Sequence, residues 1–479
     1  MGVDAHGLFQ HPEPAPYPFG PESVADVLIA GLETHPERVA LIDGDRSWTW
    51  TELDAAVNDA ALRFTPGHVV AVEGGNAAET IIDTLATLRA GAVAILSPIR
   101  HALFDDVPAT RGFPSSIEPG APAVIAFTSG TSGSPKAVVH SQRNLLCPGL
   151  ISIDVEPPTP GERIGAALNL QIMNVMVLGP ISALLRGTTF VVMQPSKRSS
   201  ELAFDIERFG VTRLFAVPTQ LHDVLEQGIE PRLLTSLDRV IVGGGRGEAE
   251  LLQRFTTTFG VRPTLSYGLT EAPTGVVRES LDDPIGSGRG FALPHVDVSI
   301  RDEVGEVVPV GQAGEICLRP ARDGPWAGCW TPALGYLFDP DRTAALFVDG
   351  VLHTGDRGML DEDGALSVLG RLDAMIIRGG MNIDPEGVRQ VLLSDPTVAD
   401  AAVFGIADAR LGQRIGAMVV PVAGATIDQG ELRQGVRDQL SPQCAPDVIV
   451  ESSELPRNAM GKFTLPPELL RSLRTTDRA

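Results

Sequence analysis

The segment FTSGTSGSPKAVVHS, residues 127–141, combines small hydroxyl side chains, glycines and one lysine between two predicted strands. Glycines let backbone N–H groups turn inward, hydroxyls add hydrogen-bond donors, and the ammonium of Lys136 adds a positive charge. Such a set of groups is suited to holding a polyphosphate. A flexible Ser/Gly linker is a poorer interpretation, because strand patterns flank the segment on both sides. The segment therefore predicts a phosphate-binding loop.

Two common nucleotide-binding motifs do not match the sequence. A Walker A loop reads G-x-x-x-x-G-K-[ST], but here Pro135 precedes Lys136 and Ala137 follows it. The run GGGRGE at 243–248 does not complete the G-x-G-x-x-G pattern, because its last residue is Glu248. These departures argue against a Walker A loop and against a nicotinamide-dependent dehydrogenase.

Five motifs, in order along the chain, resemble those of the adenylate-forming superfamily, which contains acyl- and aryl-CoA ligases, adenylation domains of peptide synthetases and luciferases. The phosphate loop of this superfamily commonly reads T-S-G-T-[TS]-G-x-P-K-G, and the chain differs from it only at Ala137. The fourth motif, with two glycines and I-x-P, is most similar to CoA ligases. The motifs are TSGTSGSPK (128–136), SYGLTEAP (266–273), LHTGDRG (352–358), GRLDAMIIRGGMNIDPEGVRQVL (370–392) and PRNAMGKFTLP (456–466).

The resemblance implies an ATP-dependent reaction in two steps. The carboxylate of an acid attacks the α-phosphorus of ATP, which gives an acyl-adenylate and pyrophosphate, and a thiol, most often that of CoA, then displaces AMP. Such a transfer depends on positioning and charge neutralisation more than on covalent help from the protein. The residues implied to hold the β- and γ-phosphates are Thr128, Ser129, Gly130, Thr131, Ser132, Gly133 and Lys136.

The second and third motifs imply the residues that bind the rest of the nucleotide. By resemblance, Tyr267 stacks against adenine, Thr270 contacts the α-phosphate and Glu271 ligates Mg²⁺. One carboxylate is sufficient, because Mg²⁺ takes most of its ligands from phosphate and water. Asp356 is implied to accept both ribose hydroxyls, with help from Arg371. The wall against which adenine and the substrate lie is implied at Gly243, Gly244 and Gly245.

The last two motifs imply a mobile C-terminal domain that carries a catalytic lysine. In the superfamily this lysine, here Lys462, reaches the carboxylate of the acid and the bridging ribose oxygen, and it acts together with Lys136 and Thr270. A compact ammonium suits such a crowded point better than a guanidinium fork. Asp373 occupies the hinge position. Small residues let a pantetheine arm approach closely, so the thiol tunnel is implied at Gly379 and Gly380.

The segment expected to form the acid-binding pocket departs from the superfamily pattern. Where P-x-F-H-x-x-G is common, the chain reads LNLQIMN, so Gln171 replaces a His or aromatic side chain and Asn174 replaces a glycine. An amide forms hydrogen bonds but does not titrate, which puts the usual gating of the pocket in question. Arg246 stands where proline is common and is expected either at the surface or against an anionic group of the substrate. The apolar neighbours favour an aromatic or a modest aliphatic acid, and we favour an aromatic one.

Other functions remain open at this point. The activated acid is transferred to a carrier protein or to a nitrogen nucleophile in some members of the superfamily. The changes at Gln171 and Asn174 also leave room for an unusual acid such as nitrite, activated for diazotisation of an amine. A degenerate member would only bind a nucleotide or a partner. Against that last alternative stand five implied site residues, Lys136, Glu271, Asp356, Arg371 and Lys462.

Short apolar runs that alternate with helical patterns must position these residues. Buried strands are predicted at 124–127, 188–193, 213–217 and 238–244, and helices that end at glycine at 200–210 and 248–260. This alternation predicts a parallel sheet covered by helices. From about residue 290 the pattern changes to hairpins, as in 297–320, which predicts a β-rich subdomain. A helix should begin with Asp384 as N-cap and Pro385 at its first position.

We therefore expect an α/β protein with two domains. Residues 1–371 are expected to form an N-terminal AMP-binding domain of parallel, helix-covered sheets and a β-rich subdomain. Residues 372–479 are expected to form a small, mobile α+β domain that carries Lys462. The apolar stretch 168–185 is interrupted by Asn, Gln, Gly and Pro, so it is expected to be a buried element and not a transmembrane helix.

The composition limits the partners and the location. The net charge of −22 disfavours nucleic acid and anionic membrane surfaces, because phosphate binding needs a basic face. The four cysteines are far apart, which gives no indication of a zinc cluster, a haem attachment or a disulfide framework. The first 20 residues lack the features of a signal peptide and are expected to be a loosely ordered, Pro-rich segment. We expect a cytoplasmic protein.

Lysine is rare in this sequence. Of 38 basic residues only three are lysine, which leaves 38 − 3 = 35 arginines. Because lysine and arginine differ in shape, hydration and titration, the remaining lysines are expected where arginine would not serve. Lys136 and Lys462 lie in two of the five motifs, whereas Lys197 lies in none and is expected at the surface.

Overall fold

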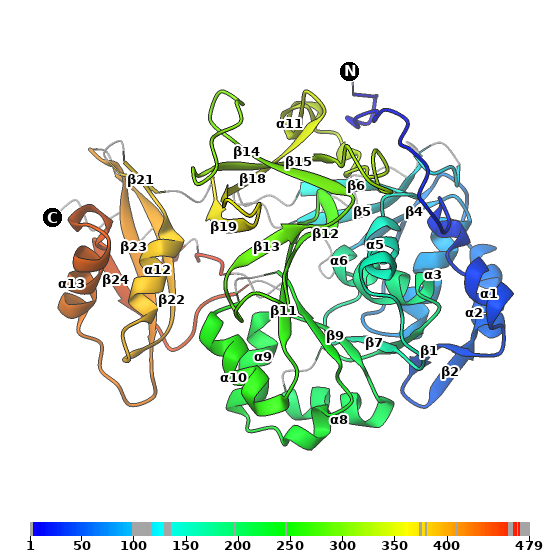
Figure 1. The fold of residues 1–479 in the computed structure, drawn as a ribbon, viewed down its shortest axis with the longest axis horizontal. Coiled ribbons are helices and arrows are strands. Elements are labelled where there is room, and N and C mark those ends of the chain that lie inside the picture. The colour runs from blue at the N-terminus through cyan, green and yellow to red at the C-terminus, as the bar shows by residue number, and fades with distance from the viewer. Residues whose placement is uncertain are drawn as a thin grey trace. The chain divides into compact units, whose positions relative to one another are not determined.

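Figure 1 shows the fold in a computed structural model of the chain. The structure describes residues 3–97, 113, 116–128, 136–195, 198–244, 247–372, 376–378, 381–408, 410–457, 463–466 and 468–469. The chain divides into two compact units. Unit 1 comprises Met1–Thr354 and Met359–Ser367, and unit 2 comprises Gly355–Gly358 and Val368–Ala479. The domain boundary between residues 371 and 372 stays a prediction.

Parallel strands form one half of the largest sheet of unit 1. Their order is β11-β10-β9-β7-β8-β1, followed by β2, which is antiparallel to β1. Most of these strands are short and apolar, as expected where a sheet is covered on both faces. Their bounds are β1 (Val39–Asp43), β2 (Arg46–Thr49), β7 (Arg163–Ala166), β8 (Thr189–Val192), β9 (Arg213–Ala216), β10 (Arg239–Val242) and β11 (Pro263–Leu269). The strands predicted at 188–193, 213–217 and 238–244 are confirmed.

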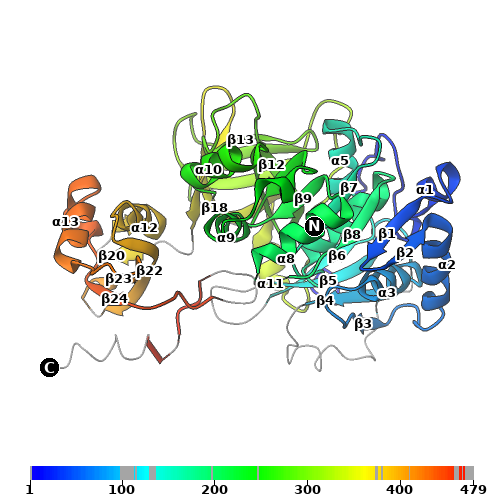
Figure 2. The same ribbon diagram turned by 90° about the horizontal axis from the view of Figure 1, so that it is seen from below.

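Three helices lie next to one another against this parallel half (Figures 1 and 2). They are α8 (Ser199–Phe209), α9 (Pro218–Glu226) and α10 (Ala249–Phe259). Leu202, Ile206 and Phe255 are buried in one core with the side chains of β9 and β10. Helices α8 and α10 end where Gly210 and Gly260 take φ of +58° and +76°, a conformation that suits glycine. Both predicted helices are confirmed.

Antiparallel strands extend the same sheet beyond β11. Their order is β12-β13-β19-β18-β15-β14, with β17 paired to β18. Their bounds are β12 (Ala272–Glu279), β13 (Arg289–Ala292), β14 (Val296–Arg301), β15 (Gly314–Pro320), β17 (Phe347–Val348), β18 (Val351–Leu360) and β19 (Leu366–Arg371). The predicted hairpin at 297–320 is the antiparallel pair β14–β15. This β-rich region is joined to the parallel half through β11, which pairs with β10 on one side and β12 on the other.

A second sheet of unit 1 carries the strands of the predicted phosphate loop. Its order is β16-β6-β5-β4-β3, where β3, β4 and β5 are parallel and β6 is antiparallel to both β5 and β16. The bounds are β3 (Val69–Ala71), β4 (Val93–Leu96), β5 (Pro122–Thr128), β6 (Lys136–Ser141) and β16 (Gly335–Tyr336). Further helices of unit 1 are η1 (Val24–Asp26), α1 (Ile29–Thr34), α2 (Trp50–Ala61), α3 (Ala78–Arg89), α5 (Cys147–Val155), η3 (Pro231–Leu234) and α11 (Pro340–Leu346).

Within the apolar stretch 168–185, residues 173–185 form three consecutive helical segments. They are α6 (Met173–Met176), the wider π-type turn η2 (Val177–Ile181), which contains Pro180, and α7 (Ser182–Leu185). Most of their side chains are buried, as predicted. Among the residues that the structure describes, no helix has the length and apolar character needed to cross a bilayer.

The N-terminal segment packs against unit 1, which corrects the expectation of a loosely ordered segment. The side chains of Leu8, Phe9 and Tyr17 are buried. The Phe9 N–H donates to the carbonyl of Leu334 at 2.7 Å, and the guanidinium of Arg143 lies 3.8 Å from the centre of the Tyr17 ring. A few apolar and aromatic contacts thus hold a segment whose proline content suggested little order.

Unit 2 contains a small α+β fold. Its sheet has the order β21-β20-β23-β22, with β24 parallel to β23, and α12 and α13 share one apolar core with it. The bounds are β20 (Ile376–Arg378), β21 (Met381–Ile383), α12 (Pro385–Leu393), β22 (Val398–Asp408), β23 (Gly412–Pro421), α13 (Gln429–Gln439), η4 (Pro442–Cys444) and β24 (Val448–Glu451). The Asp384 side chain accepts the Glu386 N–H at 3.0 Å, which confirms the predicted helix start.

Candidate active site

Thr270 and Glu271 form the two-residue turn between β11 and β12, because Leu269 pairs directly with Ala272. Gly268 precedes this turn, and a Cβ at that position would lie 1.3 Å from the carbonyl oxygen of Thr274. No side chain fits such an approach, so the glycine of the Y-G-x-T-E motif is required by the geometry of the hairpin. The hairpin thereby fixes Thr270 and Glu271 at the end of the two strands.

Lys136 is the first residue of β6 and pairs with Thr128, the last residue of β5. This pairing brings the two ends of the predicted phosphate loop together. The loop residues Ser129, Gly130, Thr131, Ser132 and Gly133 lie outside the described residues. Within the described part of the chain, Lys136 has no carboxylate partner, and its ammonium lies over an aromatic ring. Its charge is therefore not neutralised by those residues.

Tyr336 connects Lys136 to Glu271, and sequence reasoning missed it. The Tyr336 hydroxyl donates to Glu271 Oε1 at 2.6 Å, and Lys136 Nζ lies 5.7 Å from the centre of the Tyr336 ring. Tyr336 is buried and pairs with Val138 across β16 and β6. The Ala333 N–H, just before β16, donates to the Glu271 carbonyl at 2.8 Å. We call Lys136, Thr270, Glu271 and Tyr336 the phosphate site.

Two sequence signals could have found Tyr336. It is one of only three tyrosines in 479 residues, and the Gly-Tyr pair stands in an otherwise unassigned segment between two motifs. A phenol suits this place because its ring attracts a cation and its hydroxyl forms a charge-assisted bond to a carboxylate.

The phosphate site fits a hard divalent cation. Glu271 is half-buried, and no described residue donates a hydrogen bond to its Oε2. A carboxylate oxygen that also faces a polyphosphate is a typical ligand of Mg²⁺, which completes its shell with phosphate and water. Glu271 is therefore suited to hold Mg²⁺, with Lys136 as a second positive charge.

Asp356 and Arg371, implied to bind ribose, lie together in unit 2. Arg371 Nη1 donates to Asp356 Oδ1 at 3.2 Å, and the Asp356 side chain is buried while that of Arg371 is 43% exposed. Asp356 lies in β18 and Arg371 ends β19. An exposed guanidinium beside a buried carboxylate leaves the pair within reach of a ligand.

The residues implied to face adenine lie at the ends of neighbouring parallel strands. Gly243 follows β10 and donates its N–H to the Ala216 carbonyl at 3.1 Å, and Gly244 comes next. Tyr267 is half-buried in β11, which pairs with β10. The carboxyl ends of parallel strands are the usual ligand-binding edge of such sheets. Gly245 lies outside the described residues.

The two unusual pocket residues have different surroundings. Gln171 Nε2 donates to the Val72 carbonyl at 2.6 Å, so this amide holds the segment against the residue that follows β3. The Leu170 N–H donates to Asn76 Oδ1 at 2.9 Å and fixes the same segment. The Asn174 Oδ1 is buried, and no described residue donates a hydrogen bond to it. Asn174 thus has an acceptor to offer, whereas one of the two amide N–H groups of Gln171 is already used.

Several implied residues lie outside the described residues, so their positions are not given by the structure. They are Lys462, Asp373, Gly379, Gly380 and Arg246, together with Lys197.

Comparison with known proteins identifies the family. The profile of the AMP-binding enzyme family matches residues 99–322, and that of the AMP-binding enzyme C-terminal domain matches residues 388–462. Feruloyl-CoA synthase of Amycolatopsis sp. is 30% identical over 424 residues, which are 86% of this chain and 79% of that protein. The chain belongs to the AMP-binding enzyme family. Indoleacetate–CoA ligase of Aromatoleum aromaticum is 35% identical over 353 residues, 72% of this chain and 66% of that protein.

A solved structure supports the same assignment for this AMP-binding enzyme. The o-succinylbenzoate CoA synthetase of Bacillus subtilis, in complex with its acyl-adenylate intermediate, is 27% identical and aligns with a TM-score of 0.79 over 94% of this chain and 98% of that one. The expected α/β fold and the resemblance to the adenylate-forming superfamily are confirmed. The chain is an ATP-dependent, AMP-forming ligase.

Two buried histidines of the AMP-binding enzyme are unsuited to acid–base catalysis. Burial lowers the pKa of His140 and of His295 to about 3, so both are neutral at physiological pH. Adenylation needs positioned charges more than proton transfer, and the phosphate site contains no histidine.

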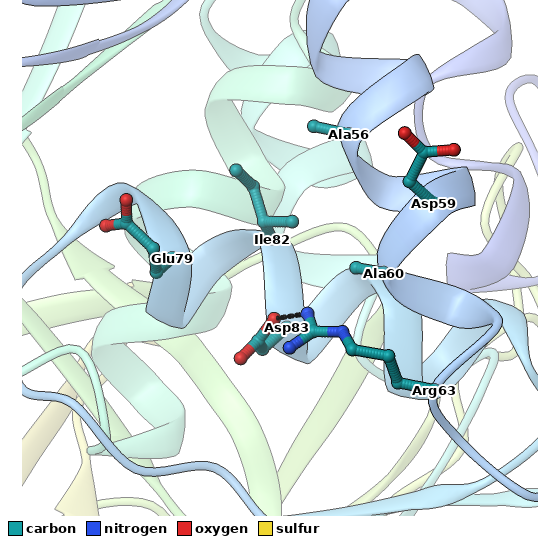
Figure 3. A pocket seen from close by; sticks show the side chains of 7 residues that line it. All are labelled: Ala56, Asp59, Ala60, Arg63, Glu79, Ile82 and Asp83. Carbon is teal, nitrogen blue, oxygen red and sulfur yellow. Dashed lines mark hydrogen bonds and ion pairs between the residues drawn. The ribbon is translucent and has the colours of Figure 1, made fainter.

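A surface groove of about 320 Å³ lies between α2 and α3 (Figure 3). Its lining residues are Ala56, Asp59, Ala60, Arg63, Glu79, Ile82 and Asp83. Arg63 and Asp83 form an ion pair inside it. Among the residues that the structure describes, none of those implied for the nucleotide or the acid lines this groove.

Proposed function

We propose that the enzyme activates a carboxylic acid with ATP and transfers the acyl group to CoA. The observation that carries this proposal is the phosphate site, where Tyr336 links a lysine without a described carboxylate partner to a half-buried carboxylate. In this proposal Lys136 binds the β- and γ-phosphates and Thr270 contacts the α-phosphate. Glu271 holds Mg²⁺, which when bound neutralises phosphate charge.

The rest of the nucleotide is assigned to residues near the strand ends. Asp356 binds the ribose hydroxyls with Arg371, whose contact at 3.2 Å supports a joint role. Tyr267 stacks on adenine, and Gly243 and Gly244 lie against it. A buried carboxylate oriented by an arginine has one fixed geometry, as a ribose-binding group requires.

The C-terminal residues are assigned from the motifs alone. Residues 372–479 form the mobile domain, Lys462 acts in adenylation, and Asp373 is the hinge about which the domain turns for thioester formation. Gly379 and Gly380 border the thiol tunnel.

Pro at position 373 should restrict the hinge, so Asp373→Pro is expected to spare ATP–pyrophosphate exchange and depress the CoA step. Equal loss of both steps would count against the hinge.

An aromatic acid is the proposed substrate. The two named relatives are ligases of indoleacetate and ferulate, both aromatic acids by name. The segment with the unusual pocket residues is apolar, and Met173, Val175 and Met176 are buried. The Asn174 Oδ1, for which no described donor exists, is available to accept a hydrogen bond from a ring N–H or hydroxyl of the acid.

One panel of assays tests this proposal. Pyrophosphate and AMP release are measured with aromatic, aliphatic and amino acids and with nitrite, each with and without CoA. We expect pyrophosphate release with aromatic acids, and AMP and thioester formation that depend on CoA. The Lys462→Ala variant serves as the control without adenylation. Turnover that never depends on CoA would point to a carrier protein or a nitrogen acceptor, and release without any acid would point to a degenerate enzyme.

A further inference from the structure

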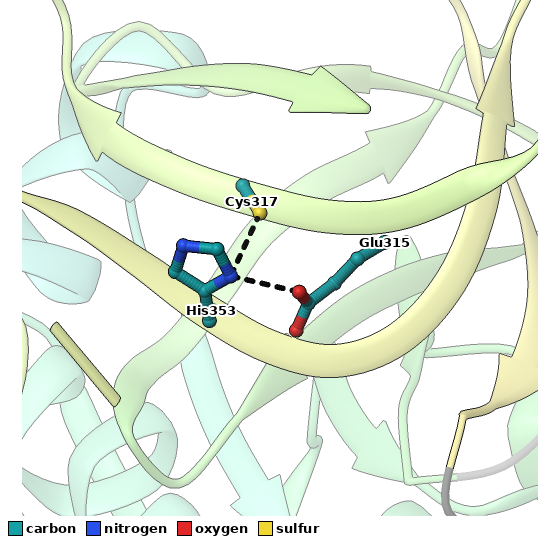
Figure 4. A group of neighbouring side chains, drawn as sticks. All are labelled: Glu315, Cys317 and His353. Carbon is teal, nitrogen blue, oxygen red and sulfur yellow. Dashed lines mark hydrogen bonds and ion pairs between the residues drawn. The ribbon is translucent and has the colours of Figure 1, made fainter. Parts of the chain in front are cut away.

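Three side chains of the types that bind metal ions meet on two adjacent strands of unit 1 (Figure 4). His353 Nδ1 lies 2.7 Å from Glu315 Oε2 and 3.6 Å from Cys317 Sγ. One donor atom from each residue lies within 4.8 Å of the other two. None of the three belongs to the phosphate site.

The strand geometry holds these side chains together. Glu315 and Cys317 are two residues apart in β15, so both point to the same face of the sheet. His353 lies in the neighbouring strand β18, and the next residue, Thr354, donates its hydroxyl to the Ile316 carbonyl at 2.7 Å. That bond fixes β18 against β15 at the level of the three side chains. The cluster is therefore built into the register of the sheet.

A hydrogen-bonded pair alone does not explain the position of Cys317. The ring nitrogen Nδ1 of His353 faces both the carboxylate and the thiol, yet a single nitrogen carries at most one proton. If it donates to Glu315, it has no lone pair for the thiol proton of Cys317, and the sulfur is at most a weak acceptor of the same N–H. A metal ion placed among the three atoms would satisfy all of them at once.

The distance between the imidazole nitrogen and the sulfur is close to that of a tetrahedral zinc site. With Zn–N near 2.0 Å and Zn–S near 2.3 Å, the two ligand atoms should be about 3.5 Å apart, and the observed distance between His353 Nδ1 and Cys317 Sγ is 3.6 Å. The Glu315 carboxylate would have to move from Nδ1 by roughly 0.6 Å. Glu315 and His353 are 19% and 20% exposed, so an ion can enter from solvent and water can be the fourth ligand.

Charge and ligand type select the ion. A thiolate, a carboxylate and a neutral imidazole carry two negative charges, which a divalent cation balances, and binding releases the thiol proton of Cys317 to solvent. Arg301 pairs with Glu315 across β14 and β15, and its positive charge repels a cation at this place. A cation that binds here must therefore gain from bonds to its ligands and not from charge alone. Sulfur and imidazole ligands bind Zn²⁺ and Co²⁺ well, whereas Mg²⁺ prefers oxygen.

We propose that Glu315, Cys317 and His353 form a binding site for one zinc-type divalent cation, separate from the Mg²⁺ ligand Glu271. The site does not depend on which acid the enzyme activates. Its ligands come from positions 315, 317 and 353, a spacing that matches no sequence motif for zinc.

A cobalt and zinc titration tests the proposal. The full-length protein is freed of metal with a chelator and titrated with Co²⁺ in the absence of ATP. We expect sulfur-to-cobalt charge-transfer absorbance that saturates at one equivalent, disappears when one equivalent of Zn²⁺ is added, and persists in excess Mg²⁺. Zn²⁺ should also raise the melting temperature.

Four variants locate the site. Cys317→Ser should remove the charge-transfer absorbance and weaken Zn²⁺ binding about tenfold or more, and His353→Gln should weaken it similarly. Cys444→Ser and His222→Gln are matched controls outside the cluster and should bind like the parent protein. If Cys317→Ser does not fold, His353→Gln and the melting shift decide the matter. Absorbance that survives in Cys317→Ser, or equal Zn²⁺ affinity in all four variants, would overturn the proposal.

Discussion

Unit 1 contains two groups of charged side chains that use their charges in opposite ways. The first, which we call the buried arginine cluster, is centred on the buried Glu162, Arg186 and Arg213. It also contains the partly buried Glu156, Arg239 and Arg278. Arg186 donates to the two oxygens of Glu162 at 2.6 and 2.8 Å, and both side chains are almost fully buried. The second group is the phosphate site, where Lys136 has no described carboxylate partner and Glu271 bonds to a neutral phenol.

The difference shows how the chain divides work between its two kinds of basic residue. An arginine fork matches a carboxylate in two bonds, so it suits a permanent buried pair. The lysine of the phosphate site is held over a ring, where its charge stays available to a ligand that arrives and leaves. The composition agrees with this division of roles. Of 38 basic residues only three are lysine, which leaves 38 − 3 = 35 arginines available for permanent pairs. The division predicts that the first group controls stability and the second controls turnover.

The largest expected effect is on turnover. Lys136→Ala should lower kcat/KM for ATP about 100-fold, because it removes the charge that we propose binds the β- and γ-phosphates. Its melting temperature should stay near that of the parent. Lys136→Arg should restore only part of the activity, because a planar guanidinium does not replace a compact ammonium. Lys197→Ala is the control and should be fully active. Full activity of Lys136→Ala would remove the phosphate site from the reaction.

The next effect is on stability alone. Glu162→Gln leaves the buried Arg186 without its counter-charge and should lower the free energy of unfolding by about 3 kcal/mol, measured by urea denaturation. Pyrophosphate release per folded molecule should be unchanged. Glu230→Gln, in an exposed pair with Arg232, is the matched control and should show no measurable loss. Similar losses in both variants would mean that burial does not distinguish the two pairs.

The parallel half of the fold could be predicted because its signals are local. The apolar run of β10 and the helical pattern of α10, which ends at Gly260, each lie within about a dozen residues. The N-terminal segment was predicted wrongly because its order depends on distant partners. Phe9 bonds to Leu334 and Tyr17 contacts Arg143, and neither contact leaves a pattern in the sequence around it.

The candidate active site likewise contains residues that a local pattern predicted and residues that depend on distant contacts. Lys136 and Glu271 lie in local motifs, so the residue types of the loop indicated Lys136 and the resemblance indicated Glu271. Tyr336 was missed because its partner Glu271 is 65 residues away and its role arises only when β16 pairs with β6. The cluster of Glu315, Cys317 and His353 likewise depends on the register of two strands. Sequence reasoning thus finds residues with a local pattern and misses those that tertiary contacts bring into place.

A smaller effect on turnover is expected at Tyr336. Tyr336→Phe removes the hydrogen bond to Glu271 but keeps the ring beneath Lys136. A bond to a charged group is worth about 1.5–3 kcal/mol, so the Mg²⁺ concentration for half-maximal rate should rise about tenfold or more. The KM for the acid should not change. Tyr17→Phe removes a hydroxyl that donates to a backbone carbonyl and serves as the control. An unchanged Mg²⁺ dependence in Tyr336→Phe would show that the phenol only packs.

The smallest expected effect is a pH dependence of stability in the buried arginine cluster. Burial disfavours the charged form of Glu156, but Arg278, Arg213 and Arg239 outweigh it and hold the pKa of this carboxyl below its usual value. A lowered pKa in the folded state means that the stability gained from Glu156 is complete above the unfolded pKa, about 4.3, and is lost as pH falls through the folded value.

Glu156→Gln removes this contribution, so the difference in unfolding free energy between the parent protein and the variant should be largest at neutral pH. It should shrink as pH falls below the unfolded pKa, because the parent then protonates Glu156 as well. Urea denaturation of both proteins across this range measures the difference. The same comparison with Glu230→Gln should show little change, since that pair is exposed. A difference that stays constant with pH would mean that the arginines respond to the shape of the residue at 156 and not to its charge. The contrast between permanently paired arginines and an available lysine would then rest on packing alone.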